Sequence, residues 1–514
     1  MTKIILLFNT IKFLKPIQVY YRLYYFARRK ARNMYGFKYP LTVTSESAPL
    51  TLQPSVPSYP SVDNKTFNFL NLSHTFENGI EWNFSEYGKL WTYNLTYFDF
   101  LQQEEIGEEK GLELIYDFID QSDAVKDGLE SFPISLRSIN WVKFLSTHQI
   151  KDRKIDDSLY AQYKILMDNL EYHLLGNHLL ENSFSLLFGA YYFQNEKFYA
   201  KAKEILIAEL DEQILDDGAH FELSPMYHQI MLFRVVDCIN LIQNNKFKKQ
   251  ELLNNLKQKA AIMLGWLENM TYKNGDIPLL NDSANGIAAT SKELFEYANN
   301  LKLKIKNSIL KESGYRKYKT AHYEMIIDIG SIGPDYQPGH AHADTFNFEL
   351  NIKDKPFIVD TGLSTYETND RRTEERSTAA HNTVEIIHTS SSEVWGGFRV
   401  ANRARVAEIK ESDNKIVATH DGYGKKFDIL HSREWVFEED KIIIKDSLNK
   451  KIKAIARLHF HPKVTEVMIR EHITINQQPL TINQYSYAPE FNTLVDAKVI
   501  EIEFEKELEM EIKL

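Results

Sequence analysis

The spacing of apolar residues changes near residue 318, and this change constrains the fold more than any other feature of the chain. Between about residues 88 and 310, apolar residues recur every three or four positions, which is the period of an amphipathic helix. Later runs such as HYEMIIDIG, TFNFELNI and KIIIKDSL alternate apolar and polar residues, as antiparallel strands with one covered face do. One hydrophobic core rarely organises 514 residues. We therefore expect a helical domain followed by a β-rich domain.

Three regions follow from this division. Residues 1–85 form an N-terminal arm and connector, in which the first 35 residues are basic, aromatic and expected to be helical. Residues 40–61 are rich in Pro, Ser and Thr, as in an extended segment. Residues 86–315 contain helices of about 12 to 20 residues with no strands between them, which predicts a helix bundle or a closed helical toroid. Residues 316–514 are predicted to form an antiparallel β-sandwich.

Charge and cysteine content exclude several classes of site. The chain has 61 Lys and Arg against 71 Asp and Glu, a net charge of -10, and general nucleic-acid binders are usually basic. The only cysteine, Cys238, lies in the apolar segment MLFRVVDCINLI and is expected to be a buried thiol. With one cysteine, neither an intrachain disulfide nor a Cys-rich zinc site can form. A metal site would therefore use His and carboxylate groups.

The N-terminal sequence predicts no membrane span. Its longest apolar run, Ile4 to Phe8, is far shorter than the roughly 20 residues that cross a bilayer. The run also lacks the cleavage site of a signal peptide. We expect a cytoplasmic or cell-associated protein of a bacterium, with a periplasmic or secreted location left open.

Histidines are concentrated in the β-rich half. His340 and His342 lie in GHAHADTFNFEL and His381 in STAAHNTVEI, with Asp360 between them in FIVDTG. Imidazole and carboxylate are the ligands that zinc accepts in the absence of cysteine. The alternative is a hydrogen-bonded histidine pair at the rim of a sheet.

A regular hairpin would conflict with the metal hypothesis. If residues 353–355 form the turn, Asp360 lies opposite Phe348, about 20 Å from His342 at the usual rise per strand residue. The metal hypothesis therefore requires residues 339–344 to fold back before the strand begins.

Two helix starts in the first half carry polar residues that are suited to chemistry. Asn177 in GNHLLEN is a good N-cap residue, and His178 would lie in the first turn, where the positive helix end disfavours its protonation and favours a neutral base. FELSPMYHQI predicts Ser224 as N-cap, Pro225 as the first helical residue and Tyr227 in the first turn. Capping and core packing remain the structural alternatives. In a toroid, helix starts at one rim converge on the cleft.

The segment SFPISLRSINWVKF offers Arg137, Asn140 and Trp141. A charge, an amide and a stacking surface suit a sugar acid, although single Arg and Trp residues more often serve the surface and the core.

Eight segments in order between about residues 85 and 405 together resemble the heparinase II/III-like polysaccharide lyases, a superfamily that includes alginate and glycosaminoglycan lyases. The segments are WTYNLTYFDFL, SFPISLRSINW, GNHLLEN, HFELSPMYHQ, GHAHADTFNFEL, VDTGLSTYE, ERSTAAHNTVEI and WGGFRVANRARV. The resemblance implies an α+β multidomain fold, with an incomplete α/α toroid followed by antiparallel β-sheets.

The resemblance also implies roles for individual positions. It makes Asn177 and His178 the pair that handles the uronate carboxylate and its α-proton, and Tyr227 a base or an acid. It places His340 on the catalytic side of the His-x-His motif and suggests Tyr366 as a second tyrosine. The residues that it implies as zinc ligands are His342, Asp360 and His381, with another divalent cation as the alternative and a structural role for the metal. The residues expected to contact substrate are Arg137, Asn140, Trp141, Glu222 and Arg376.

We therefore expect a lyase that cleaves a uronic-acid-containing acidic polysaccharide or oligosaccharide by β-elimination, leaving a 4,5-unsaturated uronic product. Asn177 would offset the charge that develops on the carboxylate, neutral His178 or ionised Tyr227 would take the proton, and a tyrosine phenol would protonate the leaving oxygen. One alternative is a glycoside hydrolase that uses Glu222 and Glu181. Another is a non-catalytic polysaccharide-binding or assembly protein. The polymer, the endo or exo mode and the oligomeric state stay open.

Overall fold

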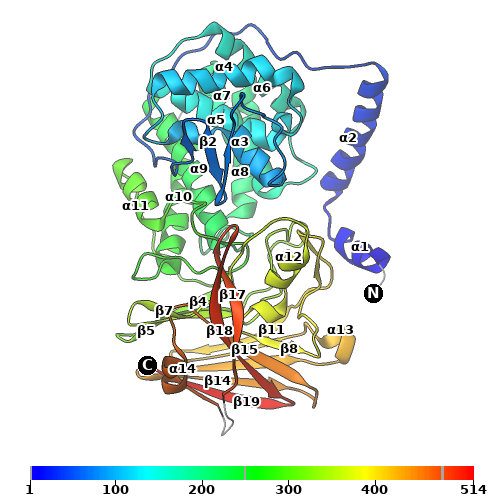
Figure 1. Ribbon diagram of the computed structural model, residues 1–514, viewed down its shortest axis with the longest axis vertical. Coiled ribbons are helices and arrows are strands. Elements are labelled where there is room, and N and C mark those ends of the chain that lie inside the picture. Colours follow the sequence, from blue (N-terminus) through cyan, green and yellow to red (C-terminus); the bar gives the residue numbers. More distant parts are fainter. Residues whose placement is uncertain (1–2, 248–250, 476–479) are drawn as a thin grey trace.

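Most helices lie in one half of the molecule and most strands in the other, as the change of period predicts (Figure 1). The computed structural model describes residues 3–247, 251–475 and 480–514. The last helix of the helical half, α11, ends at Asn300, and the first strand of the β-rich half, β4, begins at Tyr315. The predicted fold class is confirmed, with an incomplete α/α toroid followed by a β-sandwich.

The helical half has an inner and an outer layer. Almost every residue of α5, α7 and α9 is buried, whereas α4, α6, α8 and α10 each bury one face. A helix that is buried on all sides lies inside a domain, so alternate helices line the centre and cover the outside. The helices are α3 (Lys89–Tyr97), α4 (Glu108–Gln121), α5 (Ser131–Thr147), α6 (Arg153–Asp168), α7 (Gly176–Tyr192), α8 (Glu196–Gln213), α9 (Pro225–Asn244), α10 (Glu251–Met270) and α11 (Ser291–Asn300), with short 3-10 turns η1 (Asp99–Gln102), η2 (Ser122–Ala124) and η3 (Asp127–Leu129).

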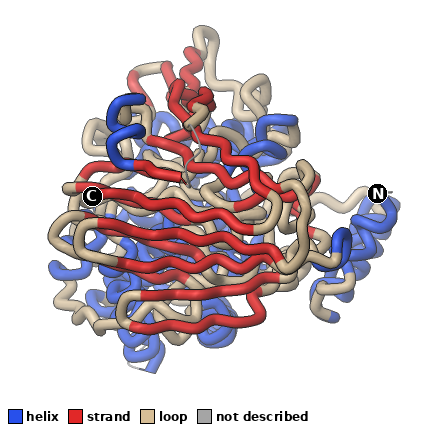
Figure 2. The backbone as a smooth tube through the Cα atoms, turned by 90° about the horizontal axis from the view of Figure 1, so that it is seen from below, coloured by secondary structure: helices blue, strands red, loops and turns tan. Residues whose placement is uncertain are grey.

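The β-rich half consists of two antiparallel sheets that enclose a second core. One sheet has the order β17-β18-β15-β7-β6-β5-β4, with β8 also paired to β15, and the other has the order β11-β12-β13-β14-β19-β16 (Figure 2). Burial alternates along β13, so one face of its sheet covers the core.

The strands of the first sheet are β4 (Tyr315–Lys319), β5 (Tyr323–Asp328), β6 (Phe348–Ile352), β7 (Lys355–Ile358), β8 (Val384–Ile386), β15 (Ala454–Phe460), β17 (Ile482–Glu490) and β18 (Thr493–Phe504). The strands of the second are β11 (Val406–Ser412), β12 (Lys415–His420), β13 (His431–Phe437), β14 (Lys441–Leu448), β16 (Ile473–Ile475) and β19 (Glu507–Lys513). A small hairpin and four short helices complete the domain: β9 (Val394–Trp395), β10 (Arg399–Val400), α12 (Asp370–Glu375), η4 (Thr378–Ala380), α13 (Gly424–Phe427) and α14 (Glu466–His472).

The N-terminal region lies along the outside of both halves. Helices α1 (Lys3–Ile11) and α2 (Pro16–Met34), which we call the arm, stand at one side of the molecule (Figure 1). Residues 40–61 contain no helix or strand and run over the toroid, where Val43 N donates to Asp157 O at 2.9 Å. A three-stranded sheet, β1 (Val62–Asp63), β2 (Thr66–Phe69) and β3 (Leu72–Thr75), follows. The sequence did not predict this sheet, because strands this short give no clear alternation.

Candidate functional site

His340 lies where the two halves of the molecule meet, among residues from three separate segments. Its Nδ1 is 2.9 Å from Asp282 Oδ2, and its Nε2 is 3.4 Å from the Asn177 amide nitrogen. Its ring stacks on Tyr227 with 3.9 Å between ring centroids, and its side chain is 13% exposed. The structure thus brings together Asn177, Tyr227 and His340, which lie far apart in the sequence.

Tyr227 is positioned by the start of α9. The Ser224 hydroxyl accepts a hydrogen bond from Tyr227 N at 3.2 Å, and Pro225 is the first helical residue, so the predicted N-cap is confirmed. Tyr366 reaches the same place from the other domain and donates to the Tyr227 hydroxyl at 3.3 Å. Burial raises the pKa of Tyr227 above its ordinary value, so the phenol keeps its proton at neutral pH.

Asn177 is not the N-cap of its helix, although the sequence made it a good candidate for that position. Helix α7 begins at Gly176, after Leu175 with a φ of 63°, so Asn177 lies within the first turn. Its amide nitrogen donates to Glu222 Oε2 at 3.1 Å and its backbone N–H to Glu222 Oε1 at 3.3 Å. Gly176 has a φ of +59°, and a Cβ at that position would lie 2.9 Å from Glu222 Oε1. Glycine therefore allows Glu222 to approach the helix start.

Glu222 belongs to the same cluster. Its side chain is 1% exposed, and Oε2 lies 3.6 Å from His340 Nε2. Burial raises the pKa of Glu222, although His340 and the Asn177 N–H oppose this. Glu181, the second carboxylate that a hydrolase would use, lies one turn after His178 in α7, where it is 1% exposed and accepts a hydrogen bond from Arg234 Nε at 3.2 Å. The structure therefore gives the hydrolase alternative no support.

The electrostatic expectation for His178 is wrong. Its Nδ1 lies 3.1 Å from Glu171 Oε1, and Asn182 holds the other carboxylate oxygen at 2.9 Å. Burial by itself would lower the pKa of His178, but the Glu171 carboxylate outweighs burial and raises it. His178 is therefore more easily protonated than an ordinary histidine. The sequence did not indicate Glu171, because the helical spacing of apolar residues continues to residue 175 and so placed Glu171 inside a helix. In the structure α6 ends at Asp168, and Glu171 lies in the loop that follows.

Asp282 is the central carboxylate of the site, and the sequence did not indicate it. It is fully buried and accepts hydrogen bonds from Arg372 Nη1 at 2.5 Å and Nη2 at 2.7 Å. It also lies 2.7 Å from His342 Nε2 and, as described, 2.9 Å from His340. Burial opposes ionisation, but Arg372 and the two histidines hold the pKa of Asp282 well below its ordinary value. Arg372 was also missed, in favour of its neighbour Arg376.

Arg376 is enclosed by the protein, so the structure gives its predicted contact with a substrate no support. It is 1% exposed, and its guanidinium donates to Ala341 O at 2.8 Å and to Gly397 O at 2.7 Å. Arg376 therefore holds the backbone between His340 and His342.

The same correction applies to Arg137, Asn140 and Trp141. Arg137 is fully buried and donates to Gln162 and to backbone carbonyls, Asn140 donates to Asp99, and Trp141 packs among core aromatic rings. Helix α5 is an inner helix, and although Arg137 and Asn140 are hydrogen-bonded within the protein, Arg137 Nη2 and Trp141 Nε1 are buried without a hydrogen-bond partner. All three side chains are enclosed by the protein, so the structure gives their predicted contact with a substrate no support.

The three residues expected to bind zinc lie close together. Asp360 Oδ2 is 2.7 Å from His381 Nδ1, the rings of His342 and His381 are 5.3 Å apart, and all three side chains are fully buried. Residues 339–347 form no strand, and Ala343 N donates to Arg376 O at 2.9 Å, so the chain folds back as the metal hypothesis requires.

Unpartnered atoms at this place fit a metal in their chemistry. His342 Nδ1, His381 Nε2 and Asp344 Oδ2 are buried without a hydrogen-bond partner, and such atoms are costly unless they are ligated. Within the described residues, however, no three His, Cys, Asp or Glu side chains are arranged to hold a metal ion. The zinc site stays a prediction.

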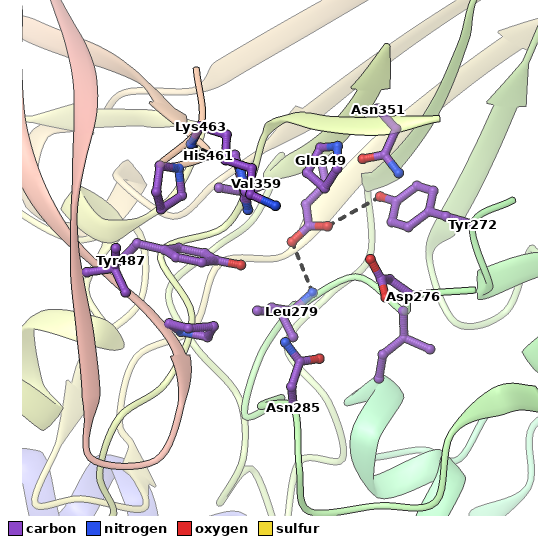
Figure 3. Close-up of a pocket in the computed structure, with 15 residues that line it drawn as sticks. Tyr272, Asp276, Leu279, Asn285, Glu349, Asn351, Val359, His461, Lys463 and Tyr487 are labelled. Carbon is purple, nitrogen blue, oxygen red and sulfur yellow. Dashed lines mark hydrogen bonds between the residues drawn. The ribbon is translucent and has the colours of Figure 1, made fainter. Parts of the chain in front are cut away.

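A separate cavity of about 320 Å³ lies between the β17–β18 hairpin and β6 (Figure 3). Tyr272, Glu349, Asn351, His461 and Tyr487 are among its lining residues. Glu349 accepts hydrogen bonds from the Tyr272 hydroxyl at 3.3 Å and from Leu279 N at 3.0 Å. The residues that line it do not include Asn177, Tyr227 or His340, so the cavity is not the reaction centre.

Two family models match adjacent parts of the chain. The model described as heparinase II/III N-terminus matches residues 119–306, and the model described as heparinase II/III-like, C-terminal, matches residues 307–507. A curated heparin-sulfate lyase of Bacteroides stercoris is 22% identical over 345 residues, which cover 60% of this chain and 49% of that protein. The chain thus spans about half the length of this curated relative.

Solved structures share the fold. The crystal structure of heparinase III is similar over 97% of this chain and 91% of that chain, with 15% identity and a TM-score of 0.68. A mutant of heparan sulfate lyase HepC from Pedobacter heparinus is similar over 87% of this chain and 81% of that chain, with 16% identity and a TM-score of 0.56. At these identities the likeness shows the architecture alone.

Proposed function

This chain belongs to the heparinase II/III-like family, and we propose that it is a polysaccharide lyase that cleaves a uronic-acid-containing acidic polysaccharide by β-elimination. The observation that carries the proposal is the convergence of Asn177, Tyr227 and His340 at the junction of the two domains. β-Elimination needs a group that offsets charge on the uronate carboxylate, a base for the C5 proton and an acid for the leaving oxygen. These three residues offer one group for each task.

The carboxylate would bind at the start of α7. The Asn177 amide can donate a hydrogen bond to the uronate, and protonated His178 can offset its negative charge. Both effects lower the cost of the second negative charge that appears when the C5 proton leaves.

His340 is the proposed base. Asp282 accepts the Nδ1 proton of the ring, which leaves Nε2 with its lone pair on the side of Asn177 and Tyr227. The C5 proton would pass to Nε2, and the C5–H electrons would form the C4–C5 double bond.

Tyr227 is the proposed acid. Its raised pKa keeps the phenol protonated, and because Tyr366 donates to its oxygen, the Tyr227 proton is free for the glycosidic oxygen. As the C4–O bond breaks, this oxygen takes the proton. The products are a new chain end and a 4,5-unsaturated uronic residue, and no water is consumed.

We also propose that His342 and His381, with Asp360 and Asp344, hold a divalent cation, zinc in the first instance. When bound, this cation would fix the loop that carries His340. No step of the elimination passes through it.

The test uses purified protein with alginate, heparan sulfate, hyaluronan, chondroitin and bacterial capsular polymers. Turnover should raise the ultraviolet absorbance of the conjugated double bond. Tyr227→Phe should lower kcat on the order of 10²- to 10⁴-fold and leave substrate binding intact. The matched control is Tyr423→Phe, which removes another buried hydroxyl, one that donates to Val384 O at 2.5 Å in the β-sandwich. Chain cleavage without the absorbance rise, or unchanged kcat in Tyr227→Phe, would contradict the proposal.

A further inference from the structure

The arm carries a charge that is opposite to that of the rest of the protein. The first acidic residue in the sequence is Glu46, although the whole chain has 71 Asp and Glu and a net charge of -10. The basic residues of the arm and its short linker are Lys3, Lys12, Lys15, Arg22, Arg28, Arg29, Lys30 and Arg32. None of them belongs to the proposed reaction centre.

Helix α2 turns its polar side toward the protein. Gln18 Nε2 donates to Leu174 O at 3.0 Å, the Tyr25 hydroxyl donates to Leu170 O at 2.6 Å, and Arg28 pairs with Asp168 at 3.1 Å. A surface helix normally buries its apolar face and exposes its polar one. In α2 this orientation is reversed.

The outward side of α2 is apolar. Val19, Leu23 and Phe26, spaced by four and three residues along one face, are 44%, 65% and 49% exposed, and Lys30 continues the same face. Tyr20, 62% exposed, lies beside them. Apolar side chains thus predominate on this exposed face.

Helix α1 extends the apolar surface. It has no buried residue, and Ile4, Leu7, Phe8 and Ile11 on one of its faces are 78%, 46%, 63% and 46% exposed. It is held to the β-sandwich domain at its end, where Trp395 Nε1 donates to Thr10 Oγ1 at 3.1 Å. Figure 1 places α2 beside the helical half and α1 beside the β-rich half, and in Figure 2 the arm again lies at the edge of the molecule.

Cations of the β-sandwich domain gather beside the arm. Burial lowers the pKa of Lys12, and the charges of Lys425, Arg403 and Arg405 lower it further, against the opposing charge of Glu393. Burial and Arg399 likewise lower the pKa of Arg22. Asp335 pairs with Arg403 at 2.7 Å. Arg399, Arg405 and Lys425 are exposed beside the arm, whereas the side chain of Arg403 is only 3% exposed.

We propose that the arm docks this protein on the surface of an anionic lipid bilayer, with the apolar faces of α1 and α2 in the interfacial layer and the flanking cations against the headgroups. Exposed aliphatic and aromatic side chains next to Lys and Arg are the features by which interfacial helices bind such surfaces. Among the described residues no helix is both long enough and apolar enough to pass through a bilayer, so the contact would be peripheral. The proposal stands independently of the lyase reaction.

The arm contacts a loop that also supports the proposed site. The loop that α2 binds, residues 169–175, carries Glu171, which holds His178. The arm is therefore joined to the loop that supports the proposed uronate-binding histidine.

The test is flotation of the full chain with vesicles of phosphatidylcholine, with and without phosphatidylglycerol. The protein should float with the anionic vesicles, less with the neutral ones, and less at high salt. Leu23→Glu should abolish flotation, and Lys30→Gln should weaken it about fivefold, as expected for one surface cation. Val467→Glu is the matched control, because Val467 is 64% exposed in α14 of the β-sandwich domain. All three variants should keep the wild-type melting temperature.

Three results would overturn the proposal. The first is wild-type protein that does not float with anionic vesicles, or that floats equally with neutral ones. The second is a Leu23→Glu variant that binds as well as Val467→Glu. The third is absence of vesicle binding together with a dimer, measured by light scattering, that Leu23→Glu dissociates, since the arm would then be an interface between copies of this chain.

Discussion

Replacement of Asp282 by Asn tests the centre of the proposed site. The carboxylate accepts four N–H hydrogen bonds, two from Arg372 and one each from His340 and His342, so each oxygen receives two. An asparagine amide has only one accepting oxygen. Its NH₂ group would face either Arg372 Nη2 and His340, or Arg372 Nη1 and His342. Because all of these groups are N–H donors, the hydrogen bonds on that side would be lost.

The expected magnitudes follow from burial. Arg372 and Asp282 are 1% and 0% exposed, and removal of one partner of a buried ion pair costs about 3–5 kcal/mol. Domains are typically stable by about 5–15 kcal/mol, so the variant should fold with a lower urea midpoint. If His340 also loses its Nδ1 acceptor, the ring takes the other tautomer and Nε2 no longer accepts a proton. A wrong tautomer of this kind costs on the order of 10⁴ in kcat.

The assays are urea unfolding followed by fluorescence, and kcat from the ultraviolet absorbance of the unsaturated product. Asp446→Asn is the control, since Asp446 is also buried and held by Arg433 at 2.7 Å and His431 at 2.7 Å, inside the β-sandwich. It should lose similar stability and keep its turnover. The reasoning fails if Asp282→Asn keeps near wild-type kcat, or if the two variants lose activity equally.

Two further predictions concern charge and metal. Because Glu171 raises the pKa of His178, their pairing stabilises the fold fully below the ordinary histidine pKa and is lost as the pH rises through the raised value. Glu171→Gln should therefore move the alkaline limb of the kcat/KM profile to lower pH, and an unmoved limb would remove His178 from uronate binding. Elemental analysis should find a divalent cation in the wild type but not in His342→Ala or His381→Ala. Chelation should lower the melting temperature of the wild type only. A metal-free wild type with an unchanged melting temperature would exclude the structural cation.

The architecture could be predicted because it depends on a periodic signal that extends over hundreds of residues. The start of α9 was equally predictable, since a Ser-Pro pair specifies a local backbone geometry. Asn177, Tyr227 and His340 were singled out by their positions, at two helix starts and in a histidine-rich segment, but their roles came from the resemblance. Their proximity depends on how two domains meet, which no local pattern describes.

Asp282 shows why part of the site was missed. Its partners His340 and Arg372 lie 58 and 90 positions further along the chain, and the segment NDSANG around it looks like an ordinary loop. Arg137 and Trp141 show the opposite error, because the sequence suggested them for substrate contact and the structure buries them. Residue types that suit a sugar also occur on helices inside a domain. Only the fold decides between these uses of the same side chains.

The Asp282–Arg372 contact also bears on how this family can be recombined. The boundary between the two matched modules falls after residue 306, and the carboxylate lies before it while the guanidinium lies after it. A chimera that joins the helical module of one relative to the sheet module of another must therefore carry both partners of this ion pair, placed so that they still meet. Without that match, each module could fold soundly while the hybrid remained inert.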